Sequence, residues 1–294
     1  MSSILNPAVP AGEYLDAFLP AALPRARAQR SWTPGEGPLP ALFLSHGAVL
    51  VFNDATFLRQ LFEWAQSLPK PKAILIVSAH WENAPLCLSA PAARTPLVYD
   101  FGGFHRRYYT MQYPTPDATA LARRVAALMP DSDPVYQHPS RGLDHGAWIP
   151  LMAMYPLADI PVLQLSMATH DPDRLIGIGG RLQPLREEGV LVIGSGFMTH
   201  GLPSLTRETM ERGEIPGWSS DFDAWAADAL ARGAVDELSD YTRAPGMPYA
   251  HPTPDHFTPL FITLGASGHP DAPVETAFDG YVVGLAKRSF QTLA

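Results

Sequence analysis

The sequence predicts an α/β fold, a single three-layer α/β/α domain built on a central mixed, largely parallel sheet. Short apolar runs rich in β-branched residues alternate with longer segments of helical pattern, which is typical of such folds. The apolar runs are continuous rather than alternating with polar residues, as expected for strands covered on both faces. The predicted strands are 41–44, 73–77, 161–165 and 190–193. The predicted helices are 54–67, 117–128, 172–188 and 220–231, with two apolar helical runs at 149–155 and 258–264.

Chain length and composition favour one folded domain preceded by an extension. The 294 residues contain 46% hydrophobic residues, which is enough for a packed core. We assign residues 39–294 to the main domain and residues 1–38 to an N-terminal extension rich in Pro and Ala. The extension is expected to be a partly ordered tail or an arm that packs on a neighbouring subunit of a homodimer. The apolar side chains of such an arm are Tyr14, Leu15, Phe18 and Leu19.

The charge balance and the cysteine content exclude several classes of partner and site. The chain carries 21 basic and 29 acidic residues, for a formal charge of -8, which disfavours binding to a phosphate backbone. Its apolar runs are shorter than the ~20 residues of a membrane helix, and Pro20 and Pro24 interrupt the N-terminal apolar patch. A single cysteine, Cys87, excludes an intramolecular disulfide and a cysteine zinc cluster. We therefore expect a cytoplasmic protein without nucleic-acid or membrane partners.

Histidines follow three of the predicted strands, each among small residues. His46 lies in Ser-His-Gly after the first strand, His80 in Ser-Ala-His-Trp-Glu after the second, and His200 in Gly-Ser-Gly-Phe-Met-Thr-His after the last. The carboxyl ends of strands in open α/β sheets form the ligand crevice, so these three side chains are expected to converge. Neutral imidazoles bind Fe, Zn, Cu and Ni, and three of them leave coordination positions open.

Two Asp-His pairs extend this pattern. Asp144-His145 and Asp255-His256 each precede an apolar helical run. A carboxylate beside a histidine can orient the ring, and it can also cap the helix that follows. Glu82 is interpreted as a metal ligand, a partner of a ligand or a solvated charge. The aromatic, glycine-rich segment 99–104 is expected to form a loop over a pocket or a surface turn.

Other catalytic patterns are missing or incomplete. No glycine-rich dinucleotide motif and no phosphate-binding loop of the Walker type follows a predicted strand. Ser195 lies in Gly-Ser-Gly-Phe-Met and not in the Gly-x-Ser-x-Gly turn of α/β-hydrolases, which disfavours a serine esterase.

Six motifs in a fixed order resemble a known family. They are Ser-His-Gly, Ser-Ala-His-Trp-Glu, Tyr-Asp-Phe-x-Gly-Phe, Arg-Gly-Leu-Asp-His-Gly-Ala-Trp, Gly-Ser-Gly-x-x-Thr-His and Pro-Thr-Pro-Asp-His-Phe. This order is similar to that of the class III extradiol ring-cleaving dioxygenases, the superfamily of the protocatechuate 4,5-dioxygenase β-subunit, in the branch that includes DOPA 4,5-dioxygenase-like enzymes. The resemblance runs from about Pro40 to the C-terminus, so it does not cover the extension.

The resemblance implies a mononuclear non-haem Fe(II) site, in which zinc sometimes takes the place of iron. By position, His46, His80 and His256 match the metal ligands. His200 matches the acid-base catalyst, which also approaches the metal, and His145 matches a catalytic histidine that contacts the substrate. The resemblance further suggests Ser45, Tyr99 and Phe104 as substrate-binding residues, and Asp255, Asp144 and Glu82 as residues around the ligands. Where the family often has His-Gly-Ser-Pro, this chain has Ala48 and Val49 in the last two places.

The function implied is an Fe(II)-dependent extradiol dioxygenase that cleaves the ring of a catecholic substrate with O2. Two alternatives remain open on the same residues. One is a zinc-dependent hydrolase that activates water, and the other is a non-catalytic protein that binds a metal or a ligand.

Overall fold

A central eight-stranded sheet organises the molecule, whose computed structural model describes residues 4–293. The strand order is β4-β3-β5-β2-β6-β1-β10-β7. The bounds are β1 Leu42–Ser45, β2 Ala73–Glu82, β3 Cys87–Leu88, β4 Tyr136–Gln137, β5 Val162–Met167, β6 Val190–Gly196, β7 Val274–Phe278 and β10 Ser289–Thr292. A separate two-stranded sheet pairs β8 (Tyr281–Val282) with β9 (Leu285–Ala286).

The four central strands are parallel, and on each side an antiparallel pairing joins them to the outer strands. Strand β6 pairs in parallel with β1 and β2, and β2 pairs in parallel with β5. Strands β3 and β10 pair antiparallel with β5 and β1, respectively. The expectation of a mixed, largely parallel sheet is therefore confirmed.

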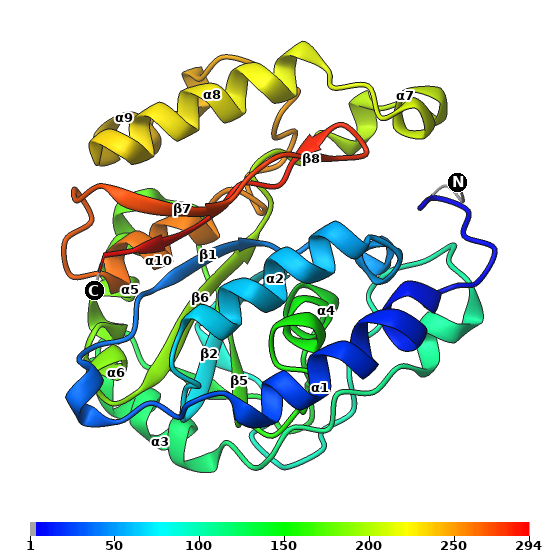
Figure 1. The fold of residues 1–294 in the computed structure, drawn as a ribbon. Coiled ribbons are helices and arrows are strands. Elements are labelled where there is room, and N and C mark those ends of the chain that lie inside the picture. Colours follow the sequence, from blue (N-terminus) through cyan, green and yellow to red (C-terminus); the bar gives the residue numbers. More distant parts are fainter. Residues whose placement is uncertain (1–3, 294) are drawn as a thin grey trace.

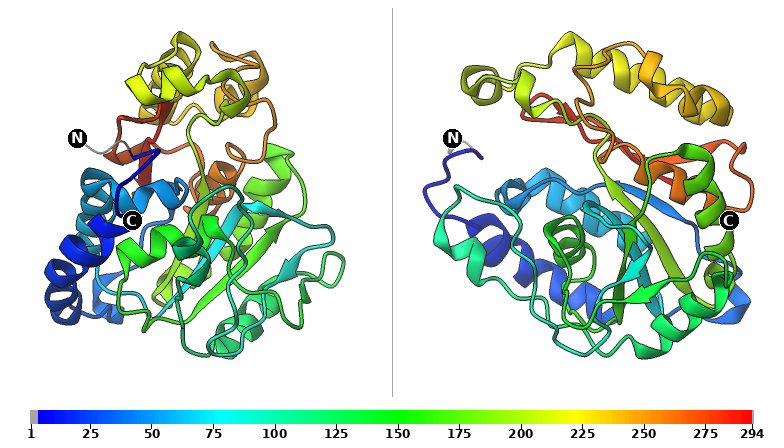
Figure 2. Two further views of the ribbon diagram at one scale, coloured as in Figure 1. Left: turned by 90° about the vertical axis from the view of Figure 1, so that its right-hand side faces the viewer. Right: turned by 180° about the vertical axis from the view of Figure 1, so that it is seen from behind.

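Helices cover both faces of this sheet, which gives three layers (Figure 1). One face packs against α2 (Ala55–Ser67) and α4 (His145–Met154). The other face packs against α3 (Thr119–Leu128), α5 (Pro172–Leu182), α6 (Pro184–Glu187), α8 (Gly217–Arg232), α9 (Val235–Ser239) and α10 (Pro259–Ala266). Both views in Figure 2 place α8 and α9 at the top and the blue N-terminal helices below the red C-terminal strands. Within residues 4–293, no helix has the length and apolar character needed to cross a membrane.

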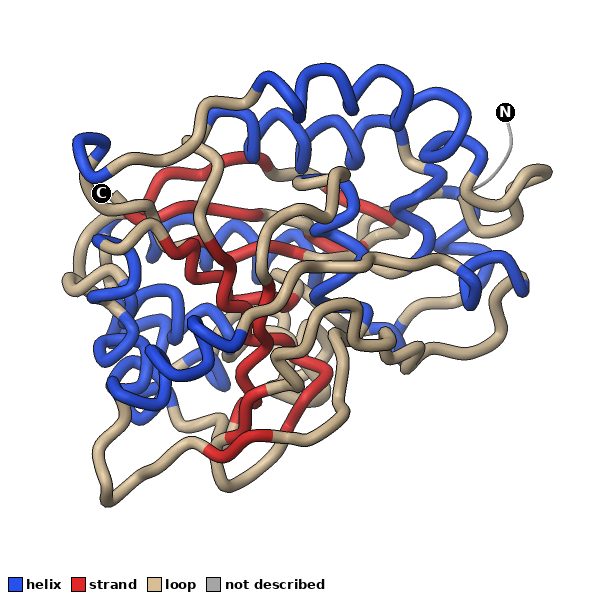
Figure 3. The backbone as a smooth tube through the Cα atoms, turned by 90° about the horizontal axis from the view of Figure 1, so that it is seen from below, coloured by secondary structure: helices blue, strands red, loops and turns tan. Residues whose placement is uncertain are grey.

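Side-chain alternation along the central strands sends one set of residues to each layer. Leu42 and Leu44 of β1, and Ile74 and Ile76 of β2, pack in the core that contains α2 and α4. Phe43, Leu75 and Val77 pack in the opposite core. Figure 3 shows the strands passing between the two groups of helices. The even-numbered positions thus face α2 and α4, and His46 and His80 continue this series at the strand ends.

The four predicted strands and the main predicted helices all form, with shifts at their ends. The helix predicted over 172–188 is two helices, because Pro184 lacks the N–H that a continuous helix requires. The run at 149–155 belongs to α4, which already begins at His145. Asp54 caps α2, since its carboxylate accepts a hydrogen bond from the Phe57 N–H at 2.9 Å. The short strands β3 and β4, the outermost two on one side of the sheet, were missed because two residues carry no periodic pattern.

The N-terminal extension packs on the main domain of its own chain and is more ordered than the tail that was expected. Residues Glu13–Phe18 form a π-helical segment and Leu19–Ala28 form α1. Tyr14 is 2% exposed, and its ring lies 4.9 Å from that of Phe52. Phe18 packs edge-on against Phe62 of α2 at 5.6 Å. The apolar side of the extension therefore covers α2, with Tyr14 buried and Leu15, Phe18 and Leu19 partly buried.

The contact between α1 and α2 yields a test of this packing. Phe62 is 2% exposed and lies against Ala22, Ala26 and Phe18. Phe62→Ala should lower the free energy of unfolding by about 3–5 kcal/mol, because the substitution leaves a cavity under α1. Glu63→Ala, which removes only the exposed ion pair with Arg25, should cost less than about 1 kcal/mol. Urea unfolding followed by circular dichroism measures both, and equal losses would contradict the packing described here.

Candidate metal centre and substrate pocket

Three imidazoles from distant parts of the chain meet at the carboxyl ends of the central strands. His46 follows β1, His80 lies near the end of β2, and His256 precedes α10. The Nε2 atom of His80 lies 3.0 Å from Nε2 of His46 and 3.2 Å from Nε2 of His256. The three ligand atoms all lie within 4.8 Å of one another, so this group could hold a metal ion.

Hydrogen bonds on the far side of two rings decide which nitrogen faces the centre. The Ser195 hydroxyl donates to the carbonyl of Gly146 at 2.5 Å, so its oxygen accepts from Nδ1–H of His46 at 3.1 Å. Asp255 Oδ2 accepts from Nδ1–H of His256 at 2.5 Å. Both rings therefore turn an unprotonated Nε2 toward His80. The lone pairs of at least two Nε2 atoms therefore point to the centre, where they are available to coordinate a cation.

Burial keeps these imidazoles neutral at neutral pH. It lowers the pKa of His46 and of His256 well below the ordinary value of 6.5, and the neighbouring imidazoles lower both further. Burial also lowers the pKa of His80 to about 3, although the nearby Asp100 carboxylate acts in the opposite direction. Neutral imidazole is the form that binds a metal.

Two glycines allow the chain segments to approach closely enough to form the centre. A Cβ on Gly146 would lie 2.4 Å from Oγ of Ser78 and 3.0 Å from Cδ2 of His80. A Cβ on Gly196 would lie 2.0 Å from the carbonyl oxygen of His256, which accepts the Phe197 N–H at 2.9 Å. Any larger residue would push α4 or the His256 segment away from the strand ends.

His145, the first residue of α4, is held by a carboxylate that sequence reasoning did not single out. Asp100 Oδ1 accepts from Nδ1–H of His145 at 2.8 Å and from its backbone N–H at 3.1 Å. Burial acts to raise the pKa of Asp100, but the hydrogen bonds from His145 outweigh it and the pKa falls below the usual value. The predicted partner, Asp144, does not contact this ring. The only sequence signal for Asp100 was its place in the aromatic segment 99–104.

His200 lies beside the three converging nitrogens and not among them. Its ring stacks on that of His256, with centroids 3.4 Å apart and planes 10° apart. Burial lowers the pKa of His200 to about 4, although Asp255 acts to raise it. The structure thus brings His200 to the centre as expected. Among the described residues, the two groups of side chains that could hold an ion are His46 with His80 and His256, and His80 with Asp100 and His145, and neither includes His200.

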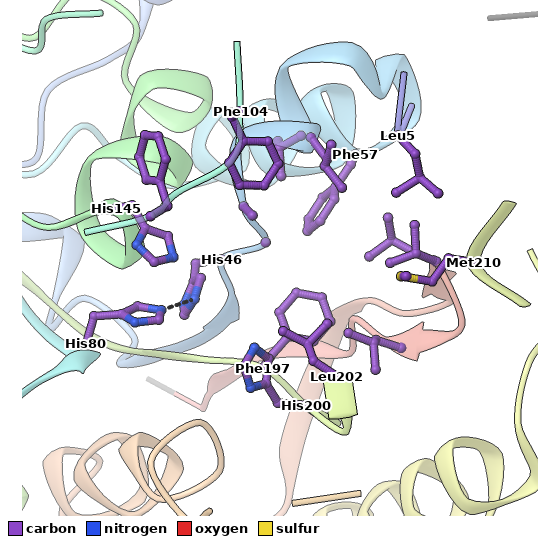
Figure 4. A pocket seen from close by; sticks show the side chains of 18 residues that line it. Leu5, His46, Phe57, His80, Phe104, His145, Phe197, His200, Leu202 and Met210 are labelled. Atoms are coloured by element: carbon purple, nitrogen blue, oxygen red, sulfur yellow. Dashed lines mark hydrogen bonds between the residues drawn. The ribbon is translucent and has the colours of Figure 1, made fainter. Parts of the chain in front are cut away.

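An apolar cavity opens beside the histidines and has a volume of about 410 Å³. His46, His80, His145 and His200 lie on one side of it, and Leu5 and Met210 lie opposite (Figure 4). The N-terminal segment, α7 (Arg207–Arg212) and β8 meet on that side of the molecule, as Figure 1 shows. Phe104 lines the cavity as predicted, and so do Phe101 and Phe197, which were not proposed as site residues.

Ser45 and Tyr99 were predicted to bind substrate, and the structure gives them other contacts. Ser45 occupies an odd position of β1, so it points away from the cavity. Its hydroxyl donates to the carbonyl of Arg288 at 3.0 Å and accepts from the Met198 N–H at 3.2 Å. The Tyr99 hydroxyl donates to the carbonyl of Met111 at 2.6 Å, which holds the ring outside the cavity lining.

Asp144 and Glu82 were predicted to surround the metal ligands, and neither contacts one of the three. Asp144 is buried, and its carboxylate accepts hydrogen bonds from Gln164 and Arg141. Burial raises its pKa, and the nearby Asp100 adds to this effect. Glu82 is the last residue of β2 and lies outside, paired with His170 at 3.1 Å. Alternation alone would place Glu82 on the side of His80, but the pairing of β2 with β5 shifts register between Val77 and Glu82, and Glu82 is exposed at the strand end.

The hydrogen bond between Asp255 and His256 predicts a specific loss of metal affinity. Asp255→Asn should weaken metal binding about 10- to 100-fold, because the carboxylate fixes the Nδ1–H tautomer and increases the basicity of Nε2. Asp271→Asn, at an exposed position away from the centre, is the matched control and should leave affinity unchanged. Competition with a chelator measures both affinities. Unchanged affinity in Asp255→Asn would contradict the role assigned to this hydrogen bond.

Known proteins resemble this chain over most of its length. A family model described as "Catalytic LigB subunit of aromatic ring-opening dioxygenase" matches residues 41–283. A Beta vulgaris protein named "4,5-DOPA dioxygenase extradiol" is 39% identical over 258 residues, which are 84% of this chain and 95% of that relative. An Escherichia coli (strain K12) protein of the same name is 35% identical over 233 residues, which are 78% of this chain and 85% of that relative.

A solved structure supports the same grouping. The crystal structure of an uncharacterised protein from Escherichia coli K12 superposes with a TM-score of 0.72 at 31% identity. The match covers 87% of this chain and 100% of the other. The identities, their coverage and the match of the family model agree, so the chain belongs to the LigB family of extradiol aromatic ring-opening dioxygenases.

Proposed function

We propose that the protein is an Fe(II)-dependent extradiol dioxygenase that cleaves a catecholic ring, with His46, His80 and His256 as the metal ligands. The observation that carries this proposal is the set of Nε2 lone pairs that converge beside an apolar cavity. Three neutral imidazoles suit iron and also zinc, and they leave positions open for a substrate. When bound here, Fe(II) would supply the redox chemistry with O2 and would acidify a coordinated diol.

The residues of the chain then have separable roles in binding and orienting the substrate. Phe101 and Phe104 line one wall of the cavity and Phe197 lines another, so an aromatic ring can be held between apolar surfaces. Apart from the four histidines, the described side chains that line the cavity are apolar, so side-chain hydrogen-bond partners for water lie at the histidine side. Asp100 fixes the His145 ring through Nδ1–H, which leaves Nε2 of His145 as its free polar atom.

Proton transfer is assigned to His200. It lines the cavity beside the His256 ring, and burial keeps it neutral at neutral pH, so its imidazole can accept a proton from a catechol hydroxyl. The nearby Asp255 carboxylate favours the protonated form that results. His145, held by Asp100, is the second candidate for a proton donor or acceptor at the substrate.

Anaerobic loading with Fe(II), followed by a panel of catechols and air, tests the proposed function. We expect O2 uptake and a coloured ring-opened product with at least one catechol, and no uptake in protein loaded with zinc. Hydrolysis by the zinc form without O2 would favour the hydrolase alternative. Tight catechol binding without turnover under either metal would favour the non-catalytic alternative. Full iron occupancy in His46→Ala would remove His46 from the ligand set.

The role of His200 predicts a variant that keeps its metal and loses turnover. His200→Phe should lower kcat about 10²- to 10⁴-fold, the range typical of a lost acid-base group, because the stacked ring is retained without its proton acceptor. Iron content should stay near that of the wild type. His269→Phe, the same substitution at an exposed position, should change neither quantity. If His200→Phe loses its iron, His200 is a ligand and the proton-transfer role fails.

A further inference from the structure

The cavity beside the histidines contains no charged side chain among the described residues that line it. Beyond its four histidines, its walls are aliphatic, aromatic and glycine positions. Figure 4 shows the two ends of this cavity, with the histidines at one end and Leu5 and Met210 at the other. A catechol whose oxygens lie at the histidines would therefore extend its ring substituent into an apolar space between the N-terminal segment, α7 and β8.

Charged side chains on elements that border this space have partners outside it. Lys287 Nζ donates to Gln60 Oε1 at 2.6 Å and lies 4.5 Å from the centroid of Phe57, whose ring lines the cavity. The two arginines of α7 form ion pairs on the outer surface of that helix. These pairs are Arg207 with Glu211 and Arg212 with Glu208, both at 2.7 Å.

The chemistry of the walls discriminates between classes of substituent. An ammonium or carboxylate group that enters an apolar cavity loses its hydration, and here it would gain no oppositely charged partner among the described lining residues. An alkyl or aryl group loses nothing by leaving water and gains contacts with the walls. A cavity of about 410 Å³ lies within the ~300–1,000 Å³ typical of sites for small organic ligands, so it has room for more than a bare catechol ring.

We propose that the preferred substrate is a catechol with an uncharged, apolar ring substituent, which lies against Leu202 and Met210 at the far end of the cavity. This proposal rests on the proposed function, because it takes the histidine end as the place of the diol. The apolar lining at Ala48, Leu50, Val51 and Val283 offers no partner to the charged groups of a catecholic amino acid.

Three matched catechols test the proposal on the Fe(II)-loaded protein. They are 4-propylcatechol, 3-(3,4-dihydroxyphenyl)propionate and L-DOPA, which share the diol and a three-carbon chain but differ in charge. We expect kcat/KM for 4-propylcatechol to exceed that for the other two at least about 100-fold. Across the series from 4-ethyl- to 4-butylcatechol, kcat/KM should rise about fourfold with each added methylene, which corresponds to ~0.8 kcal/mol per buried CH2. Equal or faster turnover of L-DOPA or the propionate would overturn the proposal.

Anaerobic binding separates this proposal from the proposed function. Titration of the metal-loaded protein with the same three compounds, without O2, should show the same order of affinity. If no compound is cleaved in air but the order of affinity holds, the dioxygenase assignment fails and the preference for an apolar substituent stands. If compounds are cleaved but the two acids bind as tightly as 4-propylcatechol, the dioxygenase assignment stands and the proposal fails.

A charge introduced at the far end of the cavity provides an independent test. Met210→Lys places an ammonium group against the substituent, so the ratio of kcat/KM for the propionate over 4-propylcatechol should rise at least about tenfold. Ile215→Lys adds the same charge at an exposed position outside the cavity lining and should leave this ratio unchanged. An unchanged ratio in Met210→Lys would show that the substituent does not lie against α7 and would overturn the proposal.

Discussion

The site depends on one constraint, namely that imidazole nitrogens without protons face each other in a buried space. His46 and His256 have their protons fixed on Nδ1, by Ser195 and Asp255, so their Nε2 lone pairs converge on His80. Without a cation this arrangement is repulsive and poorly solvated. The surrounding structure holds it in place through Gly146 and the strand ends, which indicates a site formed in advance for a metal ion.

The fold produces this arrangement because side chains alternate between the two faces of each strand. The even positions of β1 and β2 and the odd positions of β6 face the layer of α2 and α4, so His46, His80 and Ser195 extend the same side of the sheet. Helix α4 is buried along its whole length. It places His145 beside the histidine cluster and the Gly146 carbonyl within hydrogen-bond distance of Ser195. The cavity then forms where the N-terminal segment, α7 and β8 cover the strand ends, so its apolar character comes from segments outside the sheet.

Sequence reasoning identified the residues with strong local signals. Continuous apolar runs located the four central strands, and histidines among small residues at their ends located the centre. It was wrong about Ser45, because the choice between the two faces of a strand depends on register. It missed Asp100, whose contact with His145 spans 45 residues and has no local pattern. The apolar side of the N-terminal extension was named from the sequence, but its helices and their partners Phe52 and Phe62 were missed, because those contacts join segments far apart in the chain.

By itself, the sequence determined the α/β class, the ordered motifs of the family and the set of histidines available to a metal, because each follows from residue type and spacing along the chain. Only the tertiary structure decided which carboxylate holds which imidazole, and that His200 stacks beside the ligand group instead of within it. It alone revealed the apolar walls of the cavity. These properties arise from contacts between segments far apart in the chain, and the distances and orientations of such contacts exist only after folding.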